Sequence, residues 1–181
     1  MTTASKEERR KNVIDVLNKA RALELAAISQ YMNQHYGLDD MDFGELAGQV
    51  KLIAIDEMRH AEMFAERIKE LGGEPTADPA GPTERGQNVE AIFGFDAKAE
   101  DDAIDAYNKF LGVCRDNGDS TSVKLFEAVI DEEQEHLNYF DGVDDHIDKL
   151  NGAYLARKAG TPSNTGLNTQ GFVARQGGGA E

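Results

Sequence analysis

The sequence predicts an all-α protein, a four-helix bundle with one long crossover and a short fifth helix. Three of its four prolines, Pro75, Pro79 and Pro82, lie close together near the middle of the chain, and the fourth is Pro162. The stretches between them are free to be helical, because proline is the strongest helix breaker. Apolar residues recur in these stretches at intervals of three and four, and no alternating strand pattern interrupts them.

The first two helices have recognisable start and stop signals. The first begins at Ser5, which has Glu8 in capping-box spacing, and it ends near residue 37. The second begins near Asp42, again with a capping-box partner at Glu45, and it ends at the glycine pair at positions 72 and 73. The short turn between these helices makes them antiparallel neighbours.

The remaining elements complete the topology. A third helix is predicted over residues 89–116 and a fourth over 120–150, joined by the turn Asn117-Gly118-Asp119. A short fifth helix is predicted at about 153–158. We expect residues 1–160 to form one domain and residues 161–181 to be a polar, glycine-rich tail, to which the sequence assigns no structure.

Composition excludes several classes of function. The 181 residues include 19 Lys and Arg against 34 Asp and Glu, a formal net charge of −15. This charge repels phosphate backbones and anionic lipids, so no nucleic acid and no membrane partner is expected. Cys114 is the only cysteine, which excludes disulfide frameworks and metal sites built on paired thiolates. No apolar run has the length of a signal peptide or a membrane span, and we expect a cytoplasmic protein.

Two Glu-x-x-His motifs repeat at a fixed spacing. They are Glu57 with His60 and Glu133 with His136, and they lie 76 positions apart. A further glutamate precedes each motif by 33 positions, Glu24 in the first half and Glu100 in the second half. A duplicated helical hairpin leaves this kind of pattern in a sequence.

The repeated residues have the chemistry of a two-metal site. Residues three apart on a helix share a face, so each motif directs one carboxylate and one imidazole to the same point. Glu24 lies in an apolar stripe with Ala20 and Ala27, and a buried unpaired carboxylate there would cost several kcal/mol. Four glutamates and two histidines from four helices are the ligand set of a di-iron or di-manganese carboxylate site.

The alternative is that these residues form solvated ion pairs on helix surfaces, which acidic helices contain in plenty. The matched spacing of the two halves argues against it. The glutamates nearest the motifs are instead expected to be solvent-facing charges: Glu62, Glu66, Glu132 and Glu135.

Four stretches of the chain carry a resemblance to the bacterioferritins, the haem-containing branch of the ferritin-like family, over residues up to about 159. They are RALELAAISQYMNQHYGLDD, KLIAIDEMRHAEMFAERIKELGGEP, AEDDAIDAY and FEAVIDEEQEHLNYF. The resemblance implies a ferritin-like bundle that assembles from two-fold dimers into a hollow 24-subunit shell. It also implies iron storage: a ferroxidase oxidises Fe(II) with O2 or H2O2 at an intrasubunit di-iron centre, and the shell stores the ferric mineral.

The resemblance also assigns roles to individual residues. Two non-haem iron ions would be held by Glu24, Glu57, His60, Glu100, Glu133 and His136. Glu57 and Glu133 match the bridging carboxylates, and Tyr31 matches a tyrosine beside the centre. Leu52 replaces a cavity-facing histidine of many bacterioferritins, so an inner-surface iron site that uses Asp56 is not expected.

A haem shared by two subunits is implied as well. Met58 matches the axial methionine that each subunit donates at the two-fold interface, and helical geometry turns it about 100° away from Glu57. Leu25, Ser29, Met32 and Ile55 are expected to line the haem pocket, and Arg59 to pair with a propionate. The haem would serve electron transfer, with a small electron-transfer protein as reductant.

Three other functions share parts of this pattern. A rubrerythrin-like di-iron peroxidase usually carries a paired-thiolate module, which the single Cys114 cannot build. A haem-bearing electron-transfer or scaffold assembly would use the carboxylates to hold metal only structurally. A haem-free ferritin would leave Met58 as a packing residue.

Overall fold

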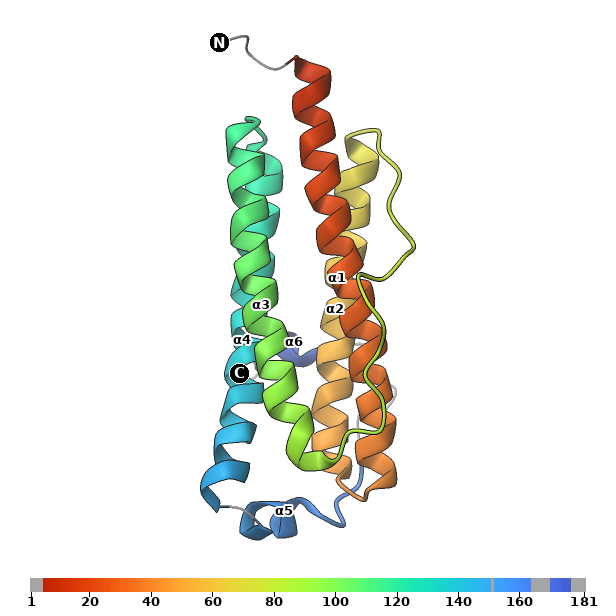
Figure 1. Cartoon of the computed structure of the whole chain (residues 1–181), viewed down its shortest axis with the longest axis vertical. Coiled ribbons are helices and arrows are strands. Elements are labelled where there is room, and N and C mark those ends of the chain that lie inside the picture. The colour runs from red at the N-terminus through yellow and green to blue at the C-terminus, as the bar shows by residue number, and fades with distance from the viewer. Residues whose placement is uncertain (1–4, 151, 164–169, 177–181) are drawn as a thin grey trace.

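The computed structural model describes residues 5–150, 152–163 and 170–176, and it confirms the predicted helical bundle (Figure 1). Over these residues the helices are α1 (Lys6–Asp40), α2 (Gly44–Glu70), α3 (Val89–Asp116), α4 (Ser120–Leu150), α5 (Gly152–Lys158) and α6 (Phe172–Gln176). The helices α1 and α2 pack together as one pair and α3 and α4 as the other. The crossover of residues 71–88 runs along the length of the first pair, as Figure 1 shows.

Two apolar clusters fill the bundle, one toward each end. The cluster at the α5 end contains Phe93 and Phe140, and the other contains Phe64 and Phe126. The site described below lies between them, so its side chains are held by packed core on both sides. Among the residues that the structure describes, no helix combines the length and the apolar character needed to cross a bilayer.

The start of α2 differs from its prediction. Asp42 has a positive φ of 67°, Phe43 is the N-cap, and no side chain of the predicted Asp42–Glu45 box caps the helix. The cap comes instead from Thr161, whose backbone oxygen accepts the Gly44 N–H at 3.1 Å and whose Oγ1 accepts the Glu45 N–H at 2.9 Å. Such a long-range cap leaves no local sequence signal. At the start of α1 the predicted cap is confirmed, since the Ser5 hydroxyl accepts the Glu8 N–H at 3.1 Å.

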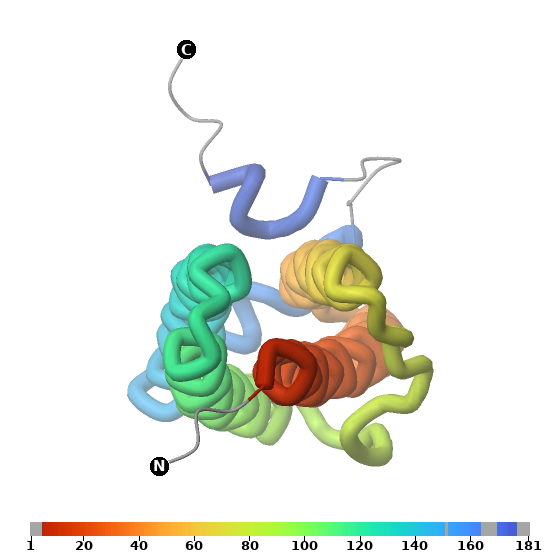
Figure 2. The backbone as a smooth tube through the Cα atoms, turned by 90° about the horizontal axis from the view of Figure 1, so that it is seen from above, coloured from red at the N-terminus to blue at the C-terminus, as the bar shows by residue number. Residues whose placement is uncertain are grey.

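The tail also differs from its prediction. The sequence assigns no structure to residues 161–181, yet residues 172–176 form α6, which packs on α2 and α4. Figure 2 shows α6 lying across the side of the bundle formed by α2 and α4, away from α1 and α3. Phe172 supplies the apolar contact of α6, although the tail as a whole is polar in composition. It is buried in the cluster at the α5 end. Residues 164–169 and 177–181 of the predicted tail lie outside the described part.

We expect Gly44→Ala to destabilise the protein, because a β-carbon at this position would collide with the backbone of residues 161–163. Overpacking of this kind costs about 1–3 kcal/mol of unfolding free energy. Gly37→Ala is the matched control, since a β-carbon there meets no other atom within 4 Å and alanine favours a helix. Denaturation curves of both variants test this. Equal stability of the two variants would contradict the role of Thr161 as a backbone cap.

Candidate metal centre

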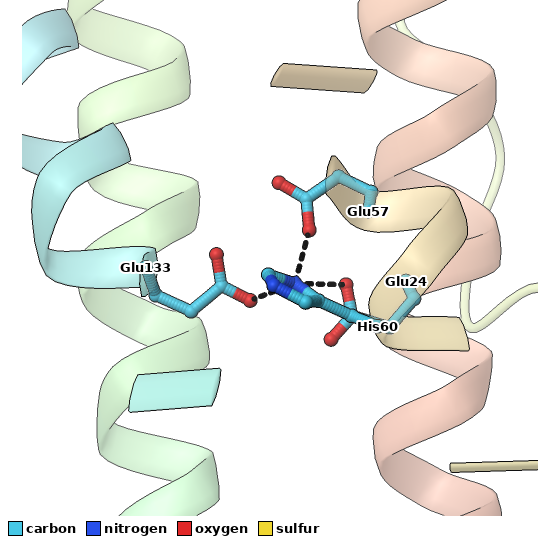
Figure 3. A group of neighbouring side chains, drawn as sticks. All are labelled: Glu24, Glu57, His60 and Glu133. Carbon is cyan, nitrogen blue, oxygen red and sulfur yellow. Dashed lines mark hydrogen bonds and ion pairs between the residues drawn. The ribbon is translucent and has the colours of Figure 1, made fainter. Parts of the chain in front are cut away.

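Six buried side chains from four helices converge at the middle of the bundle. Glu24 comes from α1, Glu100 from α3, and each of α2 and α4 supplies one Glu-x-x-His pair. All six side chains are at most 3% exposed. Figure 3 shows four of them, Glu24, Glu57, His60 and Glu133, pointing toward one another from α1, α2 and α4. The structure therefore brings together every residue that the repeat singled out.

The six residues form two overlapping groups, each able to surround one metal ion. We call these groups the His60 position (Glu24, Glu57, His60, Glu133) and the His136 position (Glu57, Glu100, Glu133, His136). In each group the potential ligand atoms lie within 4.8 Å of one another. Glu57 and Glu133 belong to both groups, which is the arrangement that bridging carboxylates require.

The two imidazoles present the same nitrogen to the centre. His60 Nδ1 lies 3.1 Å from Glu57 Oε2 and 3.2 Å from Glu133 Oε1. His136 Nδ1 lies 3.1 Å from Glu57 Oε1 and 2.9 Å from Glu133 Oε2. Nδ1 is therefore the nitrogen that faces a metal, and Nε2 of each ring points away from the centre.

Burial and charge shift the pKa values of these groups in opposite directions. The pKa values of Glu24 and Glu100 are raised well above the ordinary value. The largest cause is burial, and the next is repulsion by Glu57 and Glu133. Burial alone would raise the pKa of Glu57, but the two histidines outweigh it and lower that pKa. Burial alone would lower the pKa of both histidines, but the surrounding carboxylates raise it well above 6.5. Without metal, the environment of the centre thus favours the protonated forms of Glu24, Glu100 and the two histidines.

Two tyrosines support the carboxylates that are not shared. Tyr31 Oη donates a hydrogen bond to Glu100 Oε1 at 2.6 Å, and Tyr107 Oη donates one to Glu24 Oε1 at 2.5 Å. Both rings are buried, and each hydroxyl reaches across from one helix pair to the other. The sequence predicts this position for Tyr31 alone, and the contact of Tyr107 was not predicted. The signal was available, because Tyr107 follows Tyr31 by the same 76 positions that separate the ligands.

Two further carboxylates lie behind the histidines. Glu132 Oε2 is 3.2 Å from His60 Nε2, and Asp56 Oδ2 is 3.4 Å from His136 Nε2. The expectation that Glu132 is a solvent-facing charge is therefore wrong, although Glu62, Glu66 and Glu135 are exposed as expected. An i,i+3 surface pattern does not reveal this role, because α4 turns Glu132 toward α2. Asp56 and Glu132 are again 76 positions apart.

The donor set fits two iron or manganese ions. Carboxylate oxygen and imidazole nitrogen are the donors that these metals accept, and thiolate is absent from the described centre. Oε1 of Glu57 is buried and accepts no well-aligned hydrogen bond from the described residues, and its near neighbour is His136 Nδ1 at 3.1 Å, so a cation between the two atoms would satisfy both. A cavity of about 240 Å³ reaches the four glutamates from the side of α1 and α3, lined there by Leu23, Ala27, Ala99 and Ala103.

The residues expected at a haem lie elsewhere, on the outer surface of α1 and α2. Met58 is 46% exposed, and Leu25, Ser29, Met32 and Ile55 are all at least partly exposed. The described chain thus leaves the Met58 thioether available to an external group. Arg59 has a different contact from the expected one, since its Nη1 lies 3.1 Å from Asp56 Oδ1 and 4.0 Å from Glu132 Oε2. Leu52 is buried in the apolar core.

Comparison with known proteins gives one consistent result. The ferritin-like domain family matches residues 14–150. The bacterioferritin of Desulfovibrio desulfuricans is 59% identical over 93% of this chain and 94% of its own, and that of Mycobacterium tuberculosis is 34% identical over 77% and 87%.

Solved structures agree with these matches. The D. desulfuricans bacterioferritin, studied with its di-iron site in different catalytic states, has a TM-score of 0.90 and 58% identity over 94% of this chain and 99% of its own. The Rhodobacter capsulatus bacterioferritin, which has a metal-free dinuclear site and a haem iron, has a TM-score of 0.80 and 28% identity over 86% and 98%. This chain therefore belongs to the ferritin-like family and, within it, to the bacterioferritins.

Proposed function

We propose that this chain stores iron and is a ferroxidase, which oxidises Fe(II) to Fe(III) at the buried centre with O2 or H2O2. One observation carries the proposal: two groups of oxygen and nitrogen donors overlap through Glu57 and Glu133, so two ions are held side by side. Two Fe(II) supply two electrons together. With two protons these electrons reduce O2 to H2O2, or H2O2 to two molecules of water.

The protein residues bind both ions and limit competing chemistry. Glu57 and Glu133 hold the ions together, while Glu24 with His60 and Glu100 with His136 complete the two positions. Tyr31 and Tyr107 donate hydrogen bonds that orient the unshared carboxylates. Fe(II) competes with protons for these donors, because the pKa values of both histidines and of Glu24 and Glu100 are raised, so Fe(II) binding should release protons.

The bacterioferritin relationship supports two further parts of the proposal. The subunits would form two-fold dimers and from them a 24-subunit shell that holds the ferric mineral. A haem would lie at the dimer interface with Met58 of each subunit as axial ligand, and Leu25, Met32 and Ile55 would provide apolar contacts. When bound, the haem supplies a one-electron carrier, and a small electron-transfer protein would reduce it.

Glu133→Ala should abolish rapid Fe(II) oxidation, because it removes a ligand from both positions at once. We expect a loss of about 100-fold or more, since even residues behind the ligands are worth 10–100-fold in activity or affinity. The measurement is ferric absorbance after aerobic addition of Fe(II). Glu62→Ala, exposed on α2, is the control and should match the unmodified protein. Oxidation at the normal rate by an assembled Glu133→Ala shell would refute the ferroxidase assignment.

The metal-free protein should lose stability as the pH rises above the ordinary pKa values of glutamate and histidine, 4.5 and 6.5. Glu24, Glu100, His60 and His136 all have raised pKa values in the folded state. Their contribution to the unfolding free energy is complete below the ordinary values, 4.5 and 6.5, and is lost as pH rises through the folded ones. Glu57 has a lowered pKa, so its contribution changes only at more acidic pH.

Thermal melts of the metal-free protein from about pH 6 to about pH 9 test the prediction, with Mn(II) as a redox-inert comparison. Metal binding should release protons and tighten as the pH rises, so the added stability from Mn(II) should be larger at pH 9 than at pH 6. A melting temperature of the metal-free protein that stays constant over this range would contradict the prediction.

Met58→Leu should remove haem without removing ferroxidase activity, because the thioether lies outside the buried centre. Absorbance in the Soret region of protein made with ample haem measures the first effect, and Fe(II) oxidation measures the second. Met63→Leu, a partly buried methionine that packs on the core, is the matched control. A Soret band retained by Met58→Leu would exclude Met58 as the axial ligand.

A further inference from the structure

Two carboxylates lie behind the histidines, Asp56 behind His136 and Glu132 behind His60. The start of α6 covers Asp56 and leaves Glu132 partly exposed to solvent. The Val173 N–H donates a hydrogen bond to Asp56 Oδ2 at 2.9 Å. Gly171 packs so closely on Asp56 that a β-carbon there would collide with the carboxylate. Asp56 is fully buried as a result, whereas the side chain of its repeat partner Glu132 is 26% exposed.

The same segment also covers His136, the histidine that Asp56 contacts. The Phe172 ring meets the His136 ring edge to face, with the ring centres 6.1 Å apart, and it lies 5.0 Å from the ring of Tyr139. Phe172 itself is 4% exposed, so this contact is part of the packed core. We call residues 170–176 the C-terminal clamp.

The two histidines are therefore held differently. Both direct Nε2 at a carboxylate, and Arg59 lies near both carboxylates, 3.1 Å from Asp56 and 4.0 Å from Glu132. Only Asp56 also accepts the Val173 N–H, while Glu132 has a partly solvated side chain. A carboxylate behind a metal-bound histidine fixes the orientation of the ring and raises its basicity. A buried, hydrogen-bonded carboxylate does this more effectively than a solvated one, whose interaction with the ring is screened.

We propose that the C-terminal clamp makes the two metal positions unequal, so that an ion leaves the His136 position more slowly than it leaves the His60 position. Val173 and Phe172 are positioning residues that act on the metal through Asp56 and His136. The inference rests on the proposed two-metal centre and adds that its two positions differ in how fast they release an ion. For an ion to leave the His136 position, the ring must turn against Phe172 and break its contact with Asp56.

The experiment measures metal release without any redox chemistry. The assembled, metal-free protein is loaded anaerobically with two Co(II) per subunit, excess EDTA is added, and the loss of the Co(II) ligand-field absorbance is followed. The unmodified protein should release its ions in two phases of equal amplitude. We expect the slow phase to be about 10–100-fold slower than the fast one, the range typical of residues behind metal ligands.

Paired variants assign the two phases. Val173→Pro removes the N–H, and Phe172→Ala removes the ring that covers His136; each should accelerate the slow phase about tenfold and leave the fast phase unchanged. Val173→Ala keeps the N–H and should behave like the unmodified protein. Glu132→Gln, on the other half of the repeat, should accelerate only the fast phase.

Three results would overturn the inference. They are a single release phase in the unmodified protein, no change in either phase in Val173→Pro and Phe172→Ala, or an equal acceleration of both phases by these variants. Fewer than two Co(II) bound per subunit would instead refute the two-metal centre, and the clamp inference with it. Phe172→Ala keeps the test valid if Val173→Pro does not assemble.

Discussion

The structure depends on burying four carboxylates and two imidazoles at one point inside a helical bundle. An ionised carboxylate without a partner costs several kcal/mol in such a place, so the protein must balance the charge wherever it places the side chains. In the metal-free state two features contribute to this balance: the raised pKa values of Glu24, Glu100 and both histidines favour their protonated forms, and two tyrosine hydroxyls donate hydrogen bonds to the carboxylates. Two divalent cations replace the protons and satisfy the same oxygens. The apolar clusters on either side keep the ligands from spreading apart when the cations are absent.

The repeat explains how this balance is built, because the two tyrosine hydrogen bonds and the two contacts behind the histidines all cross between the hairpins. Tyr31 of the first hairpin supports Glu100 of the second, and Tyr107 of the second supports Glu24 of the first. The outer carboxylates cross in the same way, and the rings of Phe64 and Phe140 pack on the tyrosines of the opposite hairpin. Neither hairpin can therefore complete a metal position alone, because each position takes ligands from both.

The sequence predicts most of the helices and most residues of the centre, because the sequence signals for them are local or periodic. The bounds of α3 and α4 match their predictions, since Asn88 caps one helix and the Asn117-Gly118-Asp119 turn separates the two. The spacing of the repeat predicts the six residues that the structure brings together at the candidate metal centre, and the same spacing applied to Tyr31 and Asp56 leads to Tyr107 and Glu132. The N-terminus of α2 and the position of the tail were beyond prediction. Thr161 caps a helix whose residue Glu45 lies 116 positions earlier in the chain, and Phe172 packs on His136 in another helix, and no local pattern encodes such contacts.

The two hairpins are not identical around the metal centre, and the unequal metal positions that we propose depend on the differences between them. Two identical hairpins would give two identical metal positions, yet the outer carboxylates differ in length. Asp56 is the shorter one and is closed in by the tail, whereas Glu132 is longer and partly solvated. The tail segment has no counterpart in the other half, because the residues 76 positions before it lie inside α3. The cavity reaches the carboxylates from the α1 and α3 side, and the tail closes the α2 and α4 side at His136. A symmetric ligand set in asymmetric surroundings lets one ion be retained while the other exchanges, which two equal positions could not do.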